Sequence, residues 1–154
     1  MAGASLSRGD LLLLVVVLGA FGIADSAYLA FQFYEAPGKS WCDLSDYFSC
    51  TAVRESPYAS FAGIPTAVVG VVGFGILLSL AILALRGREE IGPVRVTDAL
   101  LAFAILGALA GTVLTLIEIF VIQAICILCV IGFALDLGIL GLALLLRAAP
   151  AEGA

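Results

Sequence analysis

Residues 99–146 read ALLAFAILGALAGTVLTLIEIFVIQAICILCVIGFALDLGILGLALLL, a run in which only Glu118 and Asp136 carry charge. A single helix of this length would extend about 70 Å at 1.5 Å per residue, whereas the hydrocarbon core of a membrane is roughly 30 Å thick. The chain must therefore fold back once inside the run. Glu118 and Gln123 are the most polar positions near its middle, so we expect the turn near Gln123.

Two further apolar runs precede this one. Residues 11–33 carry a single charge, Asp25, and residues 56–85 carry none. Pro65 suits the first turn of a helix, where its missing N–H costs nothing, so the second span is expected to begin there. The first run is longer than the apolar core of a signal peptide and no small-residue cleavage motif follows it, so we expect it to remain as a span.

The composition agrees with a membrane protein. Hydrophobic residues make up 63% of the chain and charged residues 12%, against roughly half and a quarter in soluble domains. The mean hydropathy is +1.21. The predicted fold class is an all-α integral membrane bundle, one domain over residues 1–154, with helices at about 11–33, 65–86, 96–121 and 126–146.

The charges exclude some functions and predict an orientation. A net charge of −5 argues against a nucleic-acid partner, and the absence of histidine removes the usual general base and metal ligand. Basic residues favour the cytoplasmic side of a membrane protein. The loop at about 34–62 receives only Lys39 and Arg54, so it should lie outside the cytoplasm. Both termini and five arginines should lie inside: Arg8, Arg86, Arg88, Arg95 and Arg147.

Four cysteines lie on this outer side. Cys42 and Cys50 are in the long polar loop, whereas Cys126 and Cys129 form an apolar CxxC at the expected start of the fourth helix. A thiol at a helix N-terminus faces unpaired N–H groups and the positive end of the helix dipole, which favour a reactive thiolate. One pair is placed to meet an aqueous partner and the other to meet a lipophilic oxidant. The pattern predicts an electron relay.

Other interpretations of the cysteines remain open at this point. Cys42 and Cys50 could form a plain structural disulfide, which is common in exported loops. Cys126 and Cys129 could be buried and inert. A zinc or iron–sulfur site would use all four thiolates, but the spacing of the loop pair fits metal knuckles poorly, so we expect no metal.

Several short motifs occur in a defined order along most of the chain. They are Ser26-Ala27-Tyr28-Leu29, Cys42-Asp43, Cys50, Ser56, Phe61-Ala62-Gly63-Ile64-Pro65 and Cys126-Ile127-Leu128-Cys129. With this set the chain resembles the vitamin K epoxide reductase family, and more closely its prokaryotic homologues that oxidise folding proteins. The quinone-linked oxidase of Gram-negative bacteria has its CxxC in the first loop, the reverse of the order here.

The resemblance implies a role for each cysteine. Cys42 would exchange with the thiols of a partner protein, and Cys50 would pair transiently with Cys126. Cys129 would face a quinone of the menaquinone, ubiquinone or vitamin K type. The implied partner is a separate thioredoxin-like protein on the extracytoplasmic side of the plasma membrane.

The resemblance also assigns residues around the cysteines. Ser56, Ser60 and Phe133 would belong to the quinone site, and Asp43 would position the loop. The vitamin K-reducing members have a tyrosine where this chain has Phe133, which lacks a hydroxyl. This difference argues against epoxide reduction and leaves quinone reduction unaffected.

Ionisable residues inside a span are costly and usually functional or internally paired. Asp25 and Asp136 are expected at similar depths, with Asp136 about 10 Å deeper than Cys129. Each could supply protons to a quinone or make a packing contact with a hydroxyl. Glu118 should lie near the outer interface and could be solvated.

We therefore expect a membrane thiol–quinone oxidoreductase that supports disulfide-bond formation. The alternative is a non-catalytic membrane scaffold with a structural loop disulfide. The free-thiol count of an enzyme should change when quinone is added, and that of a scaffold should not.

Overall fold

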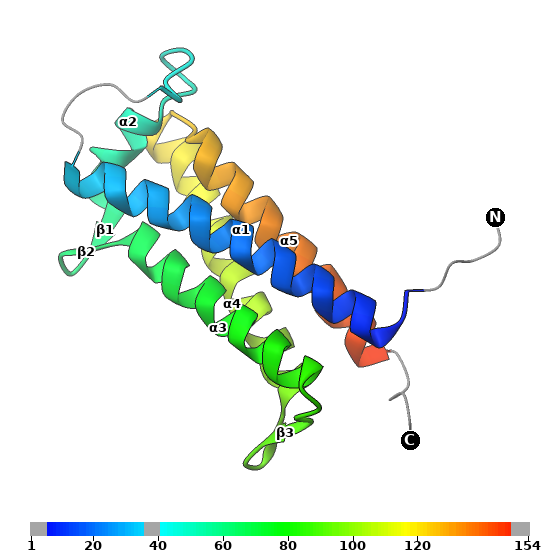
Figure 1. Ribbon diagram of the computed structural model, residues 1–154. Coiled ribbons are helices and arrows are strands. Elements are labelled where there is room, and N and C mark those ends of the chain that lie inside the picture. The colour runs from blue at the N-terminus through cyan, green and yellow to red at the C-terminus, as the bar shows by residue number, and fades with distance from the viewer. Residues whose placement is uncertain (1–5, 36–40, 149–154) are drawn as a thin grey trace, which may run out of the picture.

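The computed structural model describes residues 6–35 and 41–148, and within them the chain forms a bundle of four long helices (Figure 1). These are α1 (Arg8–Glu35), α3 (Thr66–Leu85), α4 (Val96–Ile117) and α5 (Ile127–Ala148). Each is long and apolar enough to cross a membrane, counting with α4 the turn that follows it. The predicted all-α membrane bundle is confirmed, and the chain is a multi-pass membrane protein. Lys39, expected in the outer loop, lies outside the described residues.

The start of α3 follows from its proline. Pro65 is the N-cap residue, with a φ of −60° that its ring imposes. A hairpin of β1 (Ser60–Phe61) and β2 (Ile64–Pro65) leads into it. The turn of this hairpin has positive φ at Ala62 and at Gly63, where a glycine costs no strain. The helix therefore begins where the proline predicts.

The chain reverses between α4 and α5 at Gln123. α4 continues into a wider turn, η2 (Glu118–Ile122), and Gln123 then takes the left-handed conformation with φ 59° and ψ 35°. Its backbone N–H donates to the carbonyl oxygen of Glu118, which ends the helix. The predicted position of this turn is confirmed.

The helices form a closed ring of contacts. α1 packs between α3 and α5, and α4 packs against α3 and α5 on the other side. Close approach depends on small residues, as is usual between helices in lipid. An added Cβ at Gly22 would collide with the Phe74 ring, and one at Gly70 would lie 2.7 Å from Ser26 Oγ.

The buried apolar core fills the half of the bundle nearer the termini. It combines the first turns of α1 and α4 with the later turns of α3 and α5: Leu11, Leu12, Val15, Phe74, Leu77, Leu80, Ala81, Ala84, Val96, Leu100, Leu101, Ala104, Ile139, Ala143 and Leu146. The other half is less completely filled, and it contains the cavity described below.

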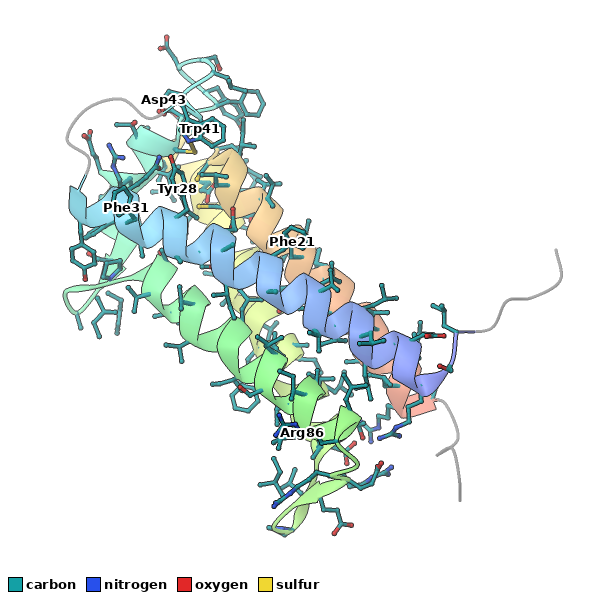
Figure 2. All side chains as sticks on the ribbon, viewed as in Figure 1. Phe21, Tyr28, Phe31, Trp41, Asp43 and Arg86 are labelled. Atoms are coloured by element: carbon teal, nitrogen blue, oxygen red, sulfur yellow. A yellow bond between two sulfur atoms is a disulfide. The ribbon has the colours of Figure 1, made fainter. Side chains whose placement is uncertain are left out.

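The two ends of the bundle differ in charge. α2 (Cys50–Arg54), the 3₁₀ turn η1 (Pro57–Ala59) and the first hairpin cover one end. The opposite end has the start of α1, the end of α5 and a second hairpin, β3 (Glu90–Ile91) and β4 (Val94–Arg95) (Figure 1). Figure 2 places Trp41 and Asp43 at the first end and Arg86 at the second. At the second end Arg8 also forms an ion pair with Glu89 at 2.9 Å.

Candidate active site

The loop cysteines form a disulfide, with Cys42 Sγ and Cys50 Sγ 2.11 Å apart. Cys50 begins α2, whose N-terminus is capped by Ser49: the Ser49 hydroxyl accepts the N–H of Ala52 at 3.1 Å. The exposed fractions of Cys42 and Cys50 are only 1% and 2%. The loop pair, expected to meet an aqueous partner, is buried in this arrangement, because the loop folds back onto the end of the bundle.

Backbone hydrogen bonds hold the loop against the turn between α4 and α5. Phe48 and Ile125 form an isolated parallel bridge. The Ile125 N–H donates to the Tyr47 carbonyl at 2.7 Å, and the Ser49 N–H donates to the Ile125 carbonyl at 3.0 Å. Because Cys50 comes two residues after Phe48 and Cys126 comes directly after Ile125, the bridge brings the two cysteines to the same place.

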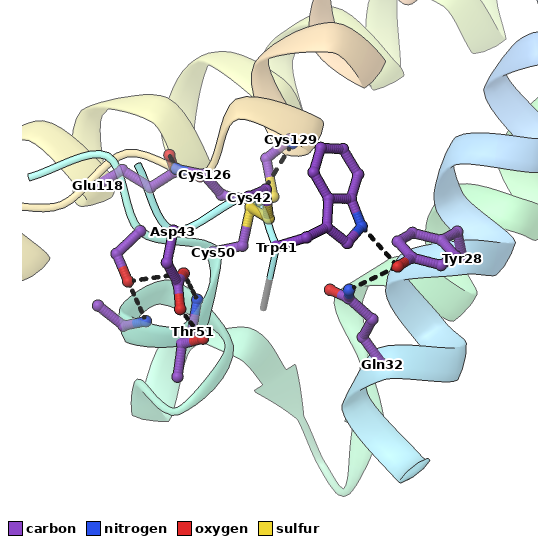
Figure 3. Close-up of a disulfide and its surroundings, with 12 residues drawn as sticks. Tyr28, Gln32, Trp41, Cys42, Asp43, Cys50, Thr51, Glu118, Cys126 and Cys129 are labelled. Atoms are coloured by element: carbon purple, nitrogen blue, oxygen red, sulfur yellow. Dashed lines mark hydrogen bonds between the residues drawn. A yellow bond between two sulfur atoms is a disulfide. The ribbon is translucent and has the colours of Figure 1, made fainter. Parts of the chain in front are cut away.

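The two cysteine pairs meet at one sulfur contact. Cys126 Sγ lies 3.2 Å from Cys50 Sγ (Figure 3). Cys126 and Cys129 are free thiols, the first buried and the second half-buried. The Cys129 N–H donates to Cys126 Sγ at 3.3 Å, so this sulfur lies at the positive N-terminal end of α5. A thiolate at Cys126 is thus placed to exchange with the loop disulfide.

Glu118 is buried beneath this contact rather than solvated. Its exposed fraction is 4%, and its Oε2 accepts the backbone N–H of Cys126 at 3.0 Å. The wider turn η2 directs the carboxylate back toward the start of α5. The interpretation of Glu118 as a solvated interface residue was wrong, because its side chain turns inward to satisfy the helix N-terminus.

Asp43 lies at the N-terminus of α2. Its Oδ1 accepts the Ser49 hydroxyl and the Thr51 N–H, both at 3.0 Å, and its Oδ2 accepts the Thr51 hydroxyl at 2.5 Å. A carboxylate in this position also interacts favourably with the unpaired N–H groups of a helix start. These bonds connect the residue after Cys42 to the residue after Cys50 across the disulfide.

A second connection ties α1 to the residue before Cys42. The Trp41 indole N–H donates to the Tyr28 hydroxyl oxygen at 2.6 Å, and the Gln32 amide donates to the same oxygen at 3.0 Å (Figure 3). We did not predict this cluster. Tyr28 and Gln32 lie four residues apart on one helix face, which is a detectable signal, but their contact with Trp41 depends on how the loop folds.

A cavity of about 900 Å³ lies below the cysteines, between all four long helices. Cys50, Cys126 and Cys129 line it, and apolar side chains make up most of its wall. The few polar groups include Asp25 and Asp136. In the described part of the chain, no group of three or more Cys, Asp and Glu side chains is arranged as metal ligands.

Two of the three residues expected at the quinone site line this cavity. They are Ser56 and Phe133; Ser60 is not among the lining residues and pairs with Pro65 in the first hairpin. The Ser56 hydroxyl donates to the Val53 carbonyl at 2.7 Å, so its one O–H is engaged. Phe133 packs against Gly111 of α4, where an added Cβ would collide with the ring.

These features define a class of protein: a membrane bundle in which a loop disulfide touches a dithiol at the mouth of an apolar cavity. The chain matches the vitamin K epoxide reductase family over residues 13–144, and it belongs to that family. The family is one of quinone-linked oxidoreductases. No curated protein matches the chain.

Proposed function

We propose that this protein is a membrane thiol–quinone oxidoreductase that supports disulfide-bond formation. Electrons would pass from a protein dithiol through Cys42 and Cys50, then through Cys126 and Cys129, to a membrane quinone. The observation that carries the proposal is the 3.2 Å distance between Cys50 Sγ and Cys126 Sγ. Disulfide exchange requires such a contact between an attacking sulfur and a disulfide sulfur. A scaffold with a structural loop disulfide has no need of one.

The first step is exchange with the partner. A thiolate of the partner attacks Cys42 Sγ and releases Cys50 as a thiolate. The second thiolate of the partner then attacks the mixed disulfide, so the partner leaves oxidised and both loop cysteines are reduced. Cys42 is buried, so the loop must open, and the exposed Trp41 beside it is the group that an arriving protein would displace from Tyr28.

The second step moves two electrons inward. Cys50 attacks Cys126 of the inner disulfide and releases Cys129, and Cys42 then attacks Cys50 and releases Cys126. The products are a loop disulfide and a reduced inner pair. That is the combination present here, with Cys42 bonded to Cys50 and both inner cysteines free.

The cavity suits a quinone head group. Its volume lies within the few hundred to about 1,000 Å³ that ligand sites offer, and its wall is mostly apolar. A bound quinone would accept two electrons and two protons from the inner dithiol. Cys129 lines the cavity beside Cys126, so the inner disulfide can re-form as the electrons leave. Ser56 and Phe133 are the residues we propose to contact the ring; without a hydroxyl, Phe133 offers only apolar contact.

The setting we propose is a plasma membrane, with residues 1–154 acting as one domain. The arginine-rich end with both termini would face the cytoplasm, and the cysteines would lie at the extracytoplasmic end. The electron donor would be a separate thioredoxin-like protein outside the cytoplasm.

Purified protein tests the proposal directly. A reduced thioredoxin-like protein and a menaquinone or ubiquinone analogue are added, and quinol formation is followed together with oxidation of the partner. We expect one quinol per partner disulfide. Cys129→Ser serves as the matched control, because it keeps the fold of the loop and removes the inner disulfide. A free-thiol count that does not change on adding quinone would instead support a scaffold.

A further inference from the structure

The cavity wall carries a carboxyl group to which the relay gives no role. Asp136 on α5 is 6% exposed and lines the cavity. Within the described residues its Oδ2 has no hydrogen-bond partner. A polar group buried in this way costs free energy unless something pairs with it, and an ionisable group inside a membrane span costs more. A ligand in the cavity would supply such a partner.

The neighbouring helix α4 packs closely against this carboxyl group and holds it in place. A Cβ added at Gly107 of α4 would lie 2.7 Å from Asp136 Oδ1 and 2.9 Å from Oδ2. Any larger residue at position 107 would therefore displace the carboxyl group. Gly107 allows α4 to pass close to α5 and leaves Asp136 facing the cavity.

Asp136 also lies in line with the reactive thiol. Cys129, Phe133 and Asp136 have the i, i+4, i+7 spacing of one helix face, and all three line the cavity. The rise of an α-helix separates Cys129 from Asp136 by about 10 Å. A quinone ring between them, beside Phe133, would direct one oxygen toward the thiol and the opposite oxygen toward the carboxyl group.

A second carboxyl group lies between these two levels. Asp25 Oδ2 of α1 lies 3.0 Å from the position that a Cβ of Gly132 would occupy. Gly132 is one turn above Asp136 on α5, and Asp25 lines the same cavity. Along the axis of α5, the Cys129 thiol comes first, Asp25 of α1 lies at the level of Gly132, and Asp136 comes last.

We propose that Asp136 is a catalytic residue of quinone reduction, which hydrogen-bonds the quinone oxygen remote from Cys129 and donates a proton to it. The inference rests on the proposed function. The inner dithiol loses two electrons and two protons as its disulfide forms. One thiol proton goes to the near oxygen, and Asp136 supplies the far one. The second thiol proton then restores Asp136 by way of Asp25, so two protons leave the thiols and two are found on the quinol.

Asp136→Asn separates binding from proton donation. The amide can still donate a hydrogen bond to a quinone oxygen but has no proton to transfer. We expect kcat for quinone reduction to fall about a hundredfold, as for loss of a general acid, while the Kd for a menaquinone analogue changes by less than about threefold. Asp136→Leu loses both functions, so its Kd should also rise by about tenfold.

Two readouts do not depend on turnover. Infrared difference spectra should contain a carboxylic C=O band that shifts when the quinone analogue binds and is missing in Asp136→Asn. Single-turnover exchange from Cys50 to Cys126 should be unchanged in the same variant. The control is Thr112→Ala, which removes an exposed α4 hydroxyl bonded only locally to the Ala108 carbonyl.

The outcomes are distinct. A wild-type kcat in Asp136→Asn, or no quinone-sensitive band from Asp136, would overturn the inference and leave the relay standing. If Asp136→Asn loses both thiol exchange and quinone reduction, the inference is also overturned, because Asp136 would then be needed for the folded structure and not for proton donation. Absence of quinone reduction in the wild-type protein would remove the proposed function, and this inference with it.

Discussion

Phe48 and Ile125 form a parallel bridge between the outer loop and the turn joining α4 to α5. This short pairing is what places one cysteine pair against the other, because Cys50 and Cys126 follow it on the two strands. The bridge joins segments that are far apart in the sequence, so closing it costs chain entropy that the hydrogen bonds and burial must offset.

Ile125→Pro removes the N–H that donates to the Tyr47 carbonyl at 2.7 Å. The net loss should be about 1 kcal/mol, and more where the freed carbonyl stays buried. We expect the rate of Cys50–Cys126 disulfide formation by a fixed concentration of an added thiol oxidant to fall about tenfold when measured in a Cys42→Ala, Cys129→Ala background. Ile125→Val keeps the N–H and is the control. Equal rates in the two variants would mean that the bridge does not position the cysteines.

Replacing either inner cysteine should abolish quinone-linked oxidation, even when a small dithiol replaces the protein partner. Cys126 and Cys129 are the two free thiols that line the cavity, and they must close a disulfide together to release two electrons to a quinone. The measurement is quinol formation by Cys126→Ala and Cys129→Ala. Residual activity above about a tenth of wild type, a barrier increase of less than about 1.4 kcal/mol, would contradict this assignment.

Asp43→Ala should loosen the loop. It removes an acceptor of three hydrogen bonds from Ser49 and Thr51, and bonds to a charged acceptor contribute about 2 kcal/mol each when partly buried. We expect faster reduction of the Cys42–Cys50 disulfide by a soluble thiol and slower transfer to Cys126. Asp43→Asn keeps one acceptor oxygen and should lie between the two. Identical reduction rates in all three proteins would remove the positioning role.

Much of the bundle could be predicted because lipid imposes strict rules. Long apolar runs, one proline and the polar residues near Gln123 are enough to place the spans and the turn. Local sequence also identifies the CxxC at the start of α5. These features depend on neighbours along the chain, so no knowledge of packing is needed.

The geometry of the site depends on tertiary contacts that no local sequence pattern predicts. The polar loop suggested an exposed Cys42, yet the bridge at Ile125 buries it. Glu118 looked solvated because it lies near a span end, and only the wider turn η2 directs it to the Cys126 N–H. Ser60 is not among the lining residues although its neighbours Ala59 and Phe61 are, because successive side chains of an extended segment point to opposite sides.

The orientation can be tested with single cysteines in a chain whose four natural cysteines are replaced by alanine. Leu44→Cys places a thiol on the outer loop, where the native side chain is 69% exposed, and Arg88→Cys places one between α3 and β3. A membrane-impermeant thiol reagent should label the first in intact cells and the second only in inverted vesicles. The opposite pattern would reverse the orientation and place the disulfide in a reducing compartment, where the relay could not run as proposed.

Cys42→Ala tests the order of electron transfer. Without Cys42, the loop has no disulfide for a protein partner to attack, so oxidation of that partner should stop. A small membrane-penetrating dithiol can enter the cavity that Cys129 lines, so its oxidation should continue. Cys50 loses its loop partner in this variant and lies 3.2 Å from Cys126. Before any dithiol is added, its thiolate should attack the inner disulfide, release Cys129 and remain bonded to Cys126, because no Cys42 is left to resolve the link; the small dithiol can then reduce this link and restart turnover.

Peptide mapping under non-reducing conditions would detect the Cys50–Cys126 disulfide. The matched control is the Cys42→Ala, Cys50→Ala double variant, which should show the same loss of partner oxidation without the cross-link. If Cys42→Ala instead loses both activities equally and forms no Cys50–Cys126 disulfide, the loop bond is structural. The contact between the pairs would then be a packing contact, and the relay would have to be withdrawn.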